Sequence, residues 1–319
     1  MRAASTFIIF ALTAAVACAA EYPTKPVRII TPFPPGGSVD LVARLIGADL
    51  GKQLGQQVVI DNRTGASGMI GTELAKNAAP DGYTLLVNTL PFVTNQFAYG
   101  KVPYDPISDF APVSLLCSIA SVLVAHPALP VNSMKELIAF ARTRPGQITY
   151  GTAGAATNPH IAGELLNHVA KIRLAAVHYK GGGPATIATL SGEVHLYFAN
   201  SLPETLPHVQ AKKLKVLGIT GAKRNPAAPQ VPTMAEAGVP GYEFTTWQIL
   251  AAPKGTPGPI VATLNDKVRT ALKAPDSAKR WQDAGLDIIA STPDEATAHL
   301  NSEIKKWRIV FKEQAIKAE

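Results

Sequence analysis

The stretch PVRIITPFPPGGSVDLVARLI, residues 26–46, decides the fold that we expect for this chain. The segment Val27–Ile30 carries β-branched residues typical of a buried strand, and Pro32–Pro35 ends that strand because proline has a fixed φ and no amide hydrogen. Gly36 and Gly37 permit a tight turn, and Ser38 is placed to cap a helix. Free N–H groups at such a helix start, beside the carboxyl end of a strand, favour an anion. The alternative is an ordinary β–α turn that binds nothing.

Length and composition indicate a folded α/β protein large enough for two domains. The chain has 319 residues, of which 47% are hydrophobic and 17% are charged. This composition excludes a disordered chain. The net charge of +7 is compatible with an anionic ligand, but the basic residues are scattered and form no tract, so we expect no nucleic-acid partner.

The first 20 residues read as a secretory signal peptide. Arg2 supplies the positive charge, and Phe7–Val16 is an apolar run too short to span a bilayer. We expect cleavage after Ala20 and export to the periplasm. Acylation of Cys18 in a lipoprotein is the less favoured alternative. Removal of the signal leaves Cys117, which we expect to be buried and unable to form an internal disulfide.

Strand-like and helix-like runs alternate along the rest of the chain, which predicts largely parallel sheets covered by helices. The segment AHPALPV, residues 125–131, marks a first crossing into a second domain, and Phe244–Ala251 reads as a strand that returns. Domain 1 is therefore expected to cover residues 21–124 and 246–319, and domain 2 residues 125–245. The final helix, from Pro293, carries Leu300 and Trp307 at a spacing that should cover domain 1. Two crossings predict a hinged α/β clamshell with a ligand cleft between its domains.

Four glycine-rich joints stand where strands lead into helices, two in each expected domain. Their residues are Gly36–Ser38, Gly65–Gly71, Gly151–Asn158 and Gly181–Gly183. If the domains face each other, several helix N-termini converge on one cleft and bind a carboxylate through backbone N–H groups. The alternative is that each glycine only permits a tight turn. None of the joints matches the Walker phosphate loop or a GxGxxG motif.

One helical stripe could hold a metal ion. His160, Glu164 and His168 recur at i, i+4 and i+8 on a predicted helix, and they would form part of a secreted metal-dependent hydrolase. An ordinary polar helix face is the favoured interpretation, because HExxH, CxxC and GxSxG are all missing.

Three further residues have two interpretations each. Asp40 either favours the helix dipole alone or faces the cleft and bonds a ligand or a closing loop. Phe33 either floors a pocket or belongs to the core, and Trp247 is either a core aromatic, which we favour, or a hinge residue.

Taken together, several motifs resemble the Bug-type family, the extracytoplasmic solute receptors of tripartite tricarboxylate transporters, and they run in order along the mature chain. They are YPTKPVRIITPFPPGGSVDLVARLI (from Tyr22), GQQVVIDNRTGASGMIGTELAKNAAPDGYTLL (from Gly55), VPYDPISDFAPVSLL (from Val102), HYKGGGPA (from His178), VPTMAEAGVPGYE (from Val231) and APKGTPGPIVATLN (from Ala252). The resemblance implies a type II periplasmic binding protein without catalysis or cofactor. It further implies a monomer that gives a small carboxylate to membrane permease subunits. A receptor that reports its ligand to a signalling kinase would use the same clamshell.

The resemblance also implies a binding site. Backbone amides and bridging waters of the loop Phe33–Asp40 would hold the carboxylate, opposed by Thr152–His160 and by Asn200-Ser201. The residues expected to bind the ligand are Phe33, Gly36, Gly37, Ser38, Asp40, Thr89, Thr152, Ala153, Gly154, Asn158, His160, Asn200 and Ser201.

Two positions depart from the pattern of the relatives. Many relatives carry an aspartate where this chain has Ala199, and a Trp-Tyr-Gly run where it has Trp247-Gln248-Ile249. The missing carboxylate removes a partner for a ligand ammonium, so we expect a dicarboxylate, a tricarboxylate or an aromatic acid rather than an amino acid.

Overall fold

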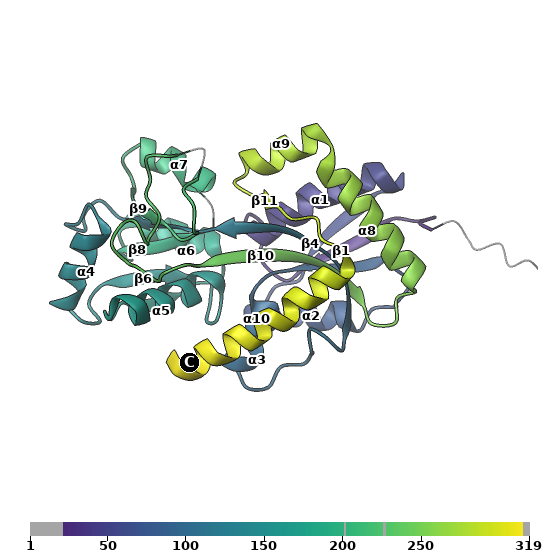
Figure 1. Ribbon diagram of the computed structural model, residues 1–319, viewed down its shortest axis with the longest axis horizontal. Coiled ribbons are helices and arrows are strands. Elements are labelled where there is room, and N and C mark those ends of the chain that lie inside the picture. The colour runs from purple at the N-terminus through teal and green to yellow at the C-terminus, as the bar shows by residue number, and fades with distance from the viewer. Residues whose placement is uncertain (1–21, 201, 226–227, 315–319) are drawn as a thin grey trace, which may run out of the picture.

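The computed structural model describes residues 22–200, 202–225 and 228–314. They form two β-sheets, each covered by helices, and the two sheets lie one after the other along the long axis of the molecule (Figure 1). The expected signal peptide, with Cys18 and Ala20, lies outside the described residues. One sheet has six strands in the order β11-β4-β10-β3-β1-β2, and the other has five in the order β7-β6-β8-β5-β9. None of the described helices is long and apolar enough to cross a membrane.

The first sheet is built on the stretch that decides the fold. Parallel β1 (Val27–Thr31) lies between β2 (Val58–Asn62) and β3 (Thr84–Asn88). Antiparallel to β3 runs β10 (Thr245–Pro253), which pairs on its other side with β4 (Phe110–Ala120), and β11 (Asp287–Ile288) closes that edge.

Helices cover both faces of this sheet, which explains why its strands carry apolar side chains on both faces. On one face, α1 (Ser38–Leu54) and α8 (Gly258–Lys273) contact each other over a core with Val27 and Ile29. On the other, α10 (Pro293–Gln314) contacts β4 and α3 (Pro91–Ala98), with α2 (Met69–Lys76) beside β1 and β3. The expected covering role of the last helix is confirmed, because Leu300 and Trp307 are buried in the core.

The second sheet places β6 (Thr149–Thr152) between parallel β7 (Ala175–His178) and β8 (Leu196–Ala199), and antiparallel β5 (Val122–Ala125) between β8 and β9 (Lys215–Ile219). Its helices are α4 (Met134–Arg142), α5 (Asn158–Ala170), α6 (Gly182–Ser191) and α7 (Leu202–Gln210).

The expectation of largely parallel sheets was wrong, because each sheet contains an antiparallel strand that leads across from the other one. The chain leaves β4 and enters β5 at Ser121, and β10 returns from the second sheet (Figure 1). Next to these crossings, the amide of Thr220 donates to the carbonyl of Ser121, and the amide of Phe244 donates to the carbonyl of Thr220. The domain limits that we propose at residues 125 and 246 lie close to them.

Other elements were not predicted. These are α3, which begins with proline, α9 (Pro275–Asp283), the short β11 and the 3₁₀ turn η1 (Ala66–Gly68). The expectation of a buried Cys117 is confirmed, and its thiol contacts the side-chain oxygen of Gln248 at 3.1 Å.

Candidate functional site

A pocket lies between the two sheets, at the carboxyl ends of the strands that lead into helices. Its cavity volume is about 60 Å³, and it opens partly to solvent. The pocket is lined by Phe33, Pro34, Pro35, Gly37, Ser38, Val39, Thr89, Pro91, Ala153, Thr157, Asn158, Pro159, Gly181, Gly182, Gly183, Pro184 and Asn200. None of these described residues carries a charged side chain.

Helix N-termini from both sides converge on this pocket. The caps of α1, α5 and α6 are Gly37, Thr157 and Gly181, and none of the three makes a side-chain capping hydrogen bond within the described structure. The hydroxyl of Thr157 donates instead to the carbonyl of Gly154 at 2.6 Å. First-turn N–H groups therefore remain for a ligand, and three helix dipoles favour negative charge. An anion fits this site without any arginine or lysine on its wall.

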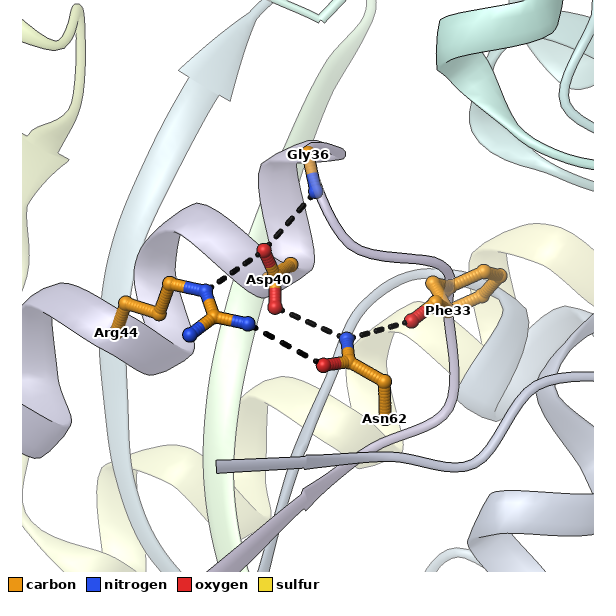
Figure 2. A network of polar contacts seen from close by, with 5 residues as sticks. All are labelled: Phe33, Gly36, Asp40, Arg44 and Asn62. Atoms are coloured by element: carbon orange, nitrogen blue, oxygen red, sulfur yellow. Dashed lines mark hydrogen bonds and ion pairs between the residues drawn. The ribbon is translucent and has the colours of Figure 1, made fainter. Parts of the chain in front are cut away.

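The loop before α1 is braced from behind by Asp40 (Figure 2). Its buried carboxylate accepts hydrogen bonds from the amide of Gly36 at 2.9 Å, from Nε of Arg44 at 3.0 Å and from Nδ2 of Asn62 at 2.9 Å. Asn62 also donates to the carbonyl of Phe33 at 3.0 Å. Burial alone would raise the pKa of Asp40, but Arg44, Gly36 and Asn62 outweigh it and lower that pKa. Asp40 therefore stays ionised and fixes the loop from outside the pocket lining.

The loop on the opposite wall is shaped by His160. Its Nδ1 accepts the amide of Ala156 at 3.0 Å, and its ring stands edge-on to His178 with centroids 4.9 Å apart. Burial, with a smaller effect of His178, lowers the pKa of His160 to about 4. The imidazole is neutral at physiological pH and serves as an internal acceptor that holds the loop.

The metal interpretation of this helix finds no support. Glu164 accepts the hydroxyl of Tyr150 at 2.6 Å, and His160 uses Nδ1 within its own loop. Among the residues that the structure describes, no group of three His, Cys, Asp or Glu side chains is arranged to hold a metal ion.

Contacts across the pocket show the two sides closed upon each other. Nδ2 of Asn158 lies 3.4 Å from Oγ1 of Thr89, which in turn donates to the carbonyl of Trp247 at 2.7 Å. Trp247 is a buried core residue whose indole N–H donates to Glu303 at 2.9 Å. The favoured interpretation of Trp247 as a core aromatic is thereby confirmed.

Comparison with known proteins gives this pocket its context. The model of the tripartite tricarboxylate transporter family receptor matches residues 42–316. The chain belongs to this receptor family. It is 35% identical to the protein BugT of Bordetella pertussis over 313 residues, which covers 98% of this chain and 96% of BugT.

Solved structures agree with the family assignment. The chain resembles Rpa4515 of R. palustris with adipate (36% identity, TM-score 0.89, 93% of this chain and 99% of that one). It also resembles MatC of Rhodopseudomonas palustris with bound malate (33%, 0.84, 91% and 99%) and the periplasmic binding protein BugD (30%, 0.87, 93% and 100%). The Bug-type resemblance and the two-domain periplasmic binding protein fold are confirmed.

In this receptor, the residues expected to bind the ligand fall into three groups. Those that line the pocket are Phe33, Gly37, Ser38, Thr89, Ala153, Asn158 and Asn200. Those that lie outside the lining are Gly36, Asp40, Thr152, Gly154 and His160, of which Asp40 and His160 brace the two loops. Ser201 lies outside the described residues. Contact of any of them with a ligand stays a prediction.

The residues that we expected to bind the ligand do not include one wall of the pocket. Residues 181–184 and the start of α3 at Pro91 line it, but neither was in the set. The triple glycine is a usable signal, because it marks a strand-to-helix joint in the sequence. Pro91, the third residue after the strand Thr84–Asn88, was the corresponding signal for α3.

Proposed function

We propose that this receptor closes over a small carboxylate in the periplasm and delivers it to the permease subunits of a tripartite transporter. The observation that carries the proposal is the convergence of the N-termini of α1, α5 and α6 on a pocket lined by no charged side chain among the described residues. Relatives described with adipate and with malate support a carboxylate as ligand. Closure then follows from contacts that the ligand makes only when both walls meet.

The ligand that we propose has no amine: a dicarboxylate, a tricarboxylate or an aromatic acid. An ammonium group needs a carboxylate or several acceptors as partners once it leaves water. Ala199 is buried at the end of β8, just before Asn200 of the pocket, and no Asp or Glu is among the described lining residues. A carboxylate therefore has several donors on these walls, and an ammonium has no acidic partner.

We further propose that the protein performs no catalysis, holds no cofactor and acts as a monomer after signal cleavage at Ala20. The lining offers neither a histidine nor a cysteine nor a carboxylate among the described residues, so general acid–base chemistry has no side chain to use there.

A thermal-shift screen tests the proposed function. The protein from Glu21 onward is unfolded and refolded to remove any ligand from expression, and is then mixed with a panel of acids. Each acid is paired with its neutral amide, such as adipate with adipamide. A ligand at 100 times its Kd adds about 2.7 kcal/mol to the free energy of unfolding, which raises the Tm by a few degrees. We expect a shift with an acid and none with its amide. Equal shifts with acid and amide, or none with any acid, would contradict the proposal.

A further inference from the structure

One buried polar atom of a pocket residue, Oδ1 of Asn158, has no hydrogen-bond partner among the described residues. Asn158 lines the pocket, is only 6% exposed and starts α5. Its Nδ2 faces Oγ1 of Thr89, but its Oδ1 has no hydrogen-bond partner among the residues that the structure describes. A buried amide oxygen without a donor destabilises the folded protein. Buried polar groups are normally paired with protein or ordered water, so this oxygen calls for a partner from outside the described residues.

The orientation of this amide is set by its neighbour. The single hydroxyl proton of Thr89 is committed to the carbonyl of Trp247 at 2.7 Å, so Oγ1 of Thr89 can only accept from Asn158. Turning the amide over would place Oδ1 against that oxygen with no proton between them. The carbonyl of Trp247 is itself held, because β10 pairs on both sides and the indole donates to Glu303.

Asn158, which lines the pocket, thus carries a buried acceptor without a partner among the described residues, whereas the helix N-termini on the pocket walls present donors. An ionised carboxylate has no proton to give this oxygen, whereas a hydroxyl group has one. We propose that Oδ1 of Asn158 accepts a hydrogen bond from a hydroxyl of the bound acid, so that the receptor prefers a hydroxycarboxylate to the same acid without its hydroxyl. This inference rests on the proposed function and names the ligand class more narrowly.

Matched pairs of acids test the preference by calorimetry. The pairs are malate with succinate, citrate with propane-1,2,3-tricarboxylate, and mandelate with phenylacetate, each titrated into the refolded protein. For the pair that fits the pocket, we expect the hydroxy acid to bind at least about tenfold more tightly, because loss of the hydroxyl leaves Oδ1 unpaired.

Variants assign the preference to Asn158. The change Asn158→Ala removes the acceptor and should bring the two members of the pair to similar Kd values. Thr89→Val releases the amide to turn over and should reduce the same ratio. The matched control is Asn200→Ala, which removes the other asparagine of the lining and should weaken both acids without changing their ratio. Circular dichroism and Tm confirm that each variant is folded.

Three results would contradict the proposed hydroxyl preference at Asn158. Two acids of one pair that bind equally well to the wild type would overturn the inference and leave the proposed function standing, as when a water fills the place at Asn158. A preference that survives in Asn158→Ala would overturn it as well. If no member of any pair binds, the proposed function fails and this inference fails with it.

Discussion

The hydroxyl of Ser67 donates to the carbonyl of Ala155 across the opening between the two domains, with Oγ and O 2.8 Å apart. Ser67 belongs to η1 beside the first sheet, and Ala155 lies in the loop between β6 and α5 of the second. The hydroxyl of Tyr99 contacts both, at 2.8 Å from Oγ of Ser67 and 3.4 Å from the carbonyl of Ala155. Because these bonds join the two sides of the opening, we expect them to stabilise the closed state together with the ligand.

Removal of the hydrogen bond between Ser67 and Ala155 should weaken ligand binding. In Ser67→Ala the closed state loses one hydrogen bond, typically about 0.5–1.5 kcal/mol, so the Kd for the carboxylate should rise by up to roughly tenfold. The Tm without ligand should change little, because the bond lies at the domain opening and its loss leaves the buried core intact. Ser302→Ala is the control, since Ser302 also donates to a carbonyl but within α10. Equal Kd values for Ser67→Ala and wild type would show that the contact has no part in closure.

A second test uses a glycine at the domain opening. Gly181 has φ 124°, and a Cβ there would lie 3.0 Å from Cγ of Pro34 on the opposite wall. Gly181→Ala should therefore raise the Kd by obstructing closure, in addition to a stability loss from its backbone conformation. The matched variant Gly241→Ala has the same kind of strain, with φ 81°, but no atom within 4 Å. Both variants should lower the Tm, and only Gly181→Ala should lower affinity; a similar loss of affinity in Gly241→Ala would refute the argument.

The bracing role of Asp40 predicts a pH-dependent effect on stability. Asp40→Asn should lower the free energy of unfolding at pH 7 by about 1–3 kcal/mol, because the bonds to Gly36, Arg44 and Asn62 suit a carboxylate. The folded pKa of Asp40 is lowered, so its contribution is present above the usual value of 3.8 and is lost as the pH falls through the folded pKa. Urea unfolding at pH 7 and pH 3 should show the difference from wild type shrinking.

The control for Asp40 is Asp294→Asn, an exposed acid in the first turn of α10. It loses only an interaction with the helix dipole, about 0.3–1 kcal/mol. An Asp40→Asn effect no larger than this would mean that the network of Figure 2 does not hold the loop.

His160 predicts a second pH dependence, in a different range. Its pKa falls from 6.5 to about 4 on folding, so the unfolded chain binds more protons between these values. The contribution of His160 to the free energy of unfolding is therefore fully present above pH 6.5. It declines by on the order of 3 kcal/mol as the pH falls towards 4. His160→Gln should flatten the profile over that range. The exposed His168 on the same helix is the control, and a His160→Gln profile as steep as that of His168→Gln would refute the assignment.

The sequence predicted the fold where chemistry at each position agreed with the element. β1, the turn and α1 follow from β-branched residues, prolines and glycines in that order. Most walls of the pocket could be inferred because glycine-rich joints mark the helix starts that line it. The roles of Asp40 and His160 could not, because they depend on Asn62 and Ala156, which only the folded chain brings close.

The antiparallel strands were missed for a physical reason. Strand direction within a sheet is not encoded in the residues of β5 or β10 themselves, since apolar runs such as 122–125 suit either direction. It depends on where the chain crosses between domains. Similarly, α3 has only eight residues and follows its strand after two residues, so its start looked like a loop.

The measurement that tests the central claim most directly is the Kd of the best carboxylate for wild type, Ser38→Asn and Ser38→Asp. Ser38 lines the pocket in the first turn of α1. An aspartate there brings its own negative charge to the N-terminus, which should keep or raise the Tm through the helix dipole while it displaces the ligand. We predict that Ser38→Asp raises the Kd at least tenfold at unchanged or higher Tm, and that Ser38→Asn has a much smaller effect. Wild-type affinity in a folded Ser38→Asp would contradict an anion held at these helix N-termini.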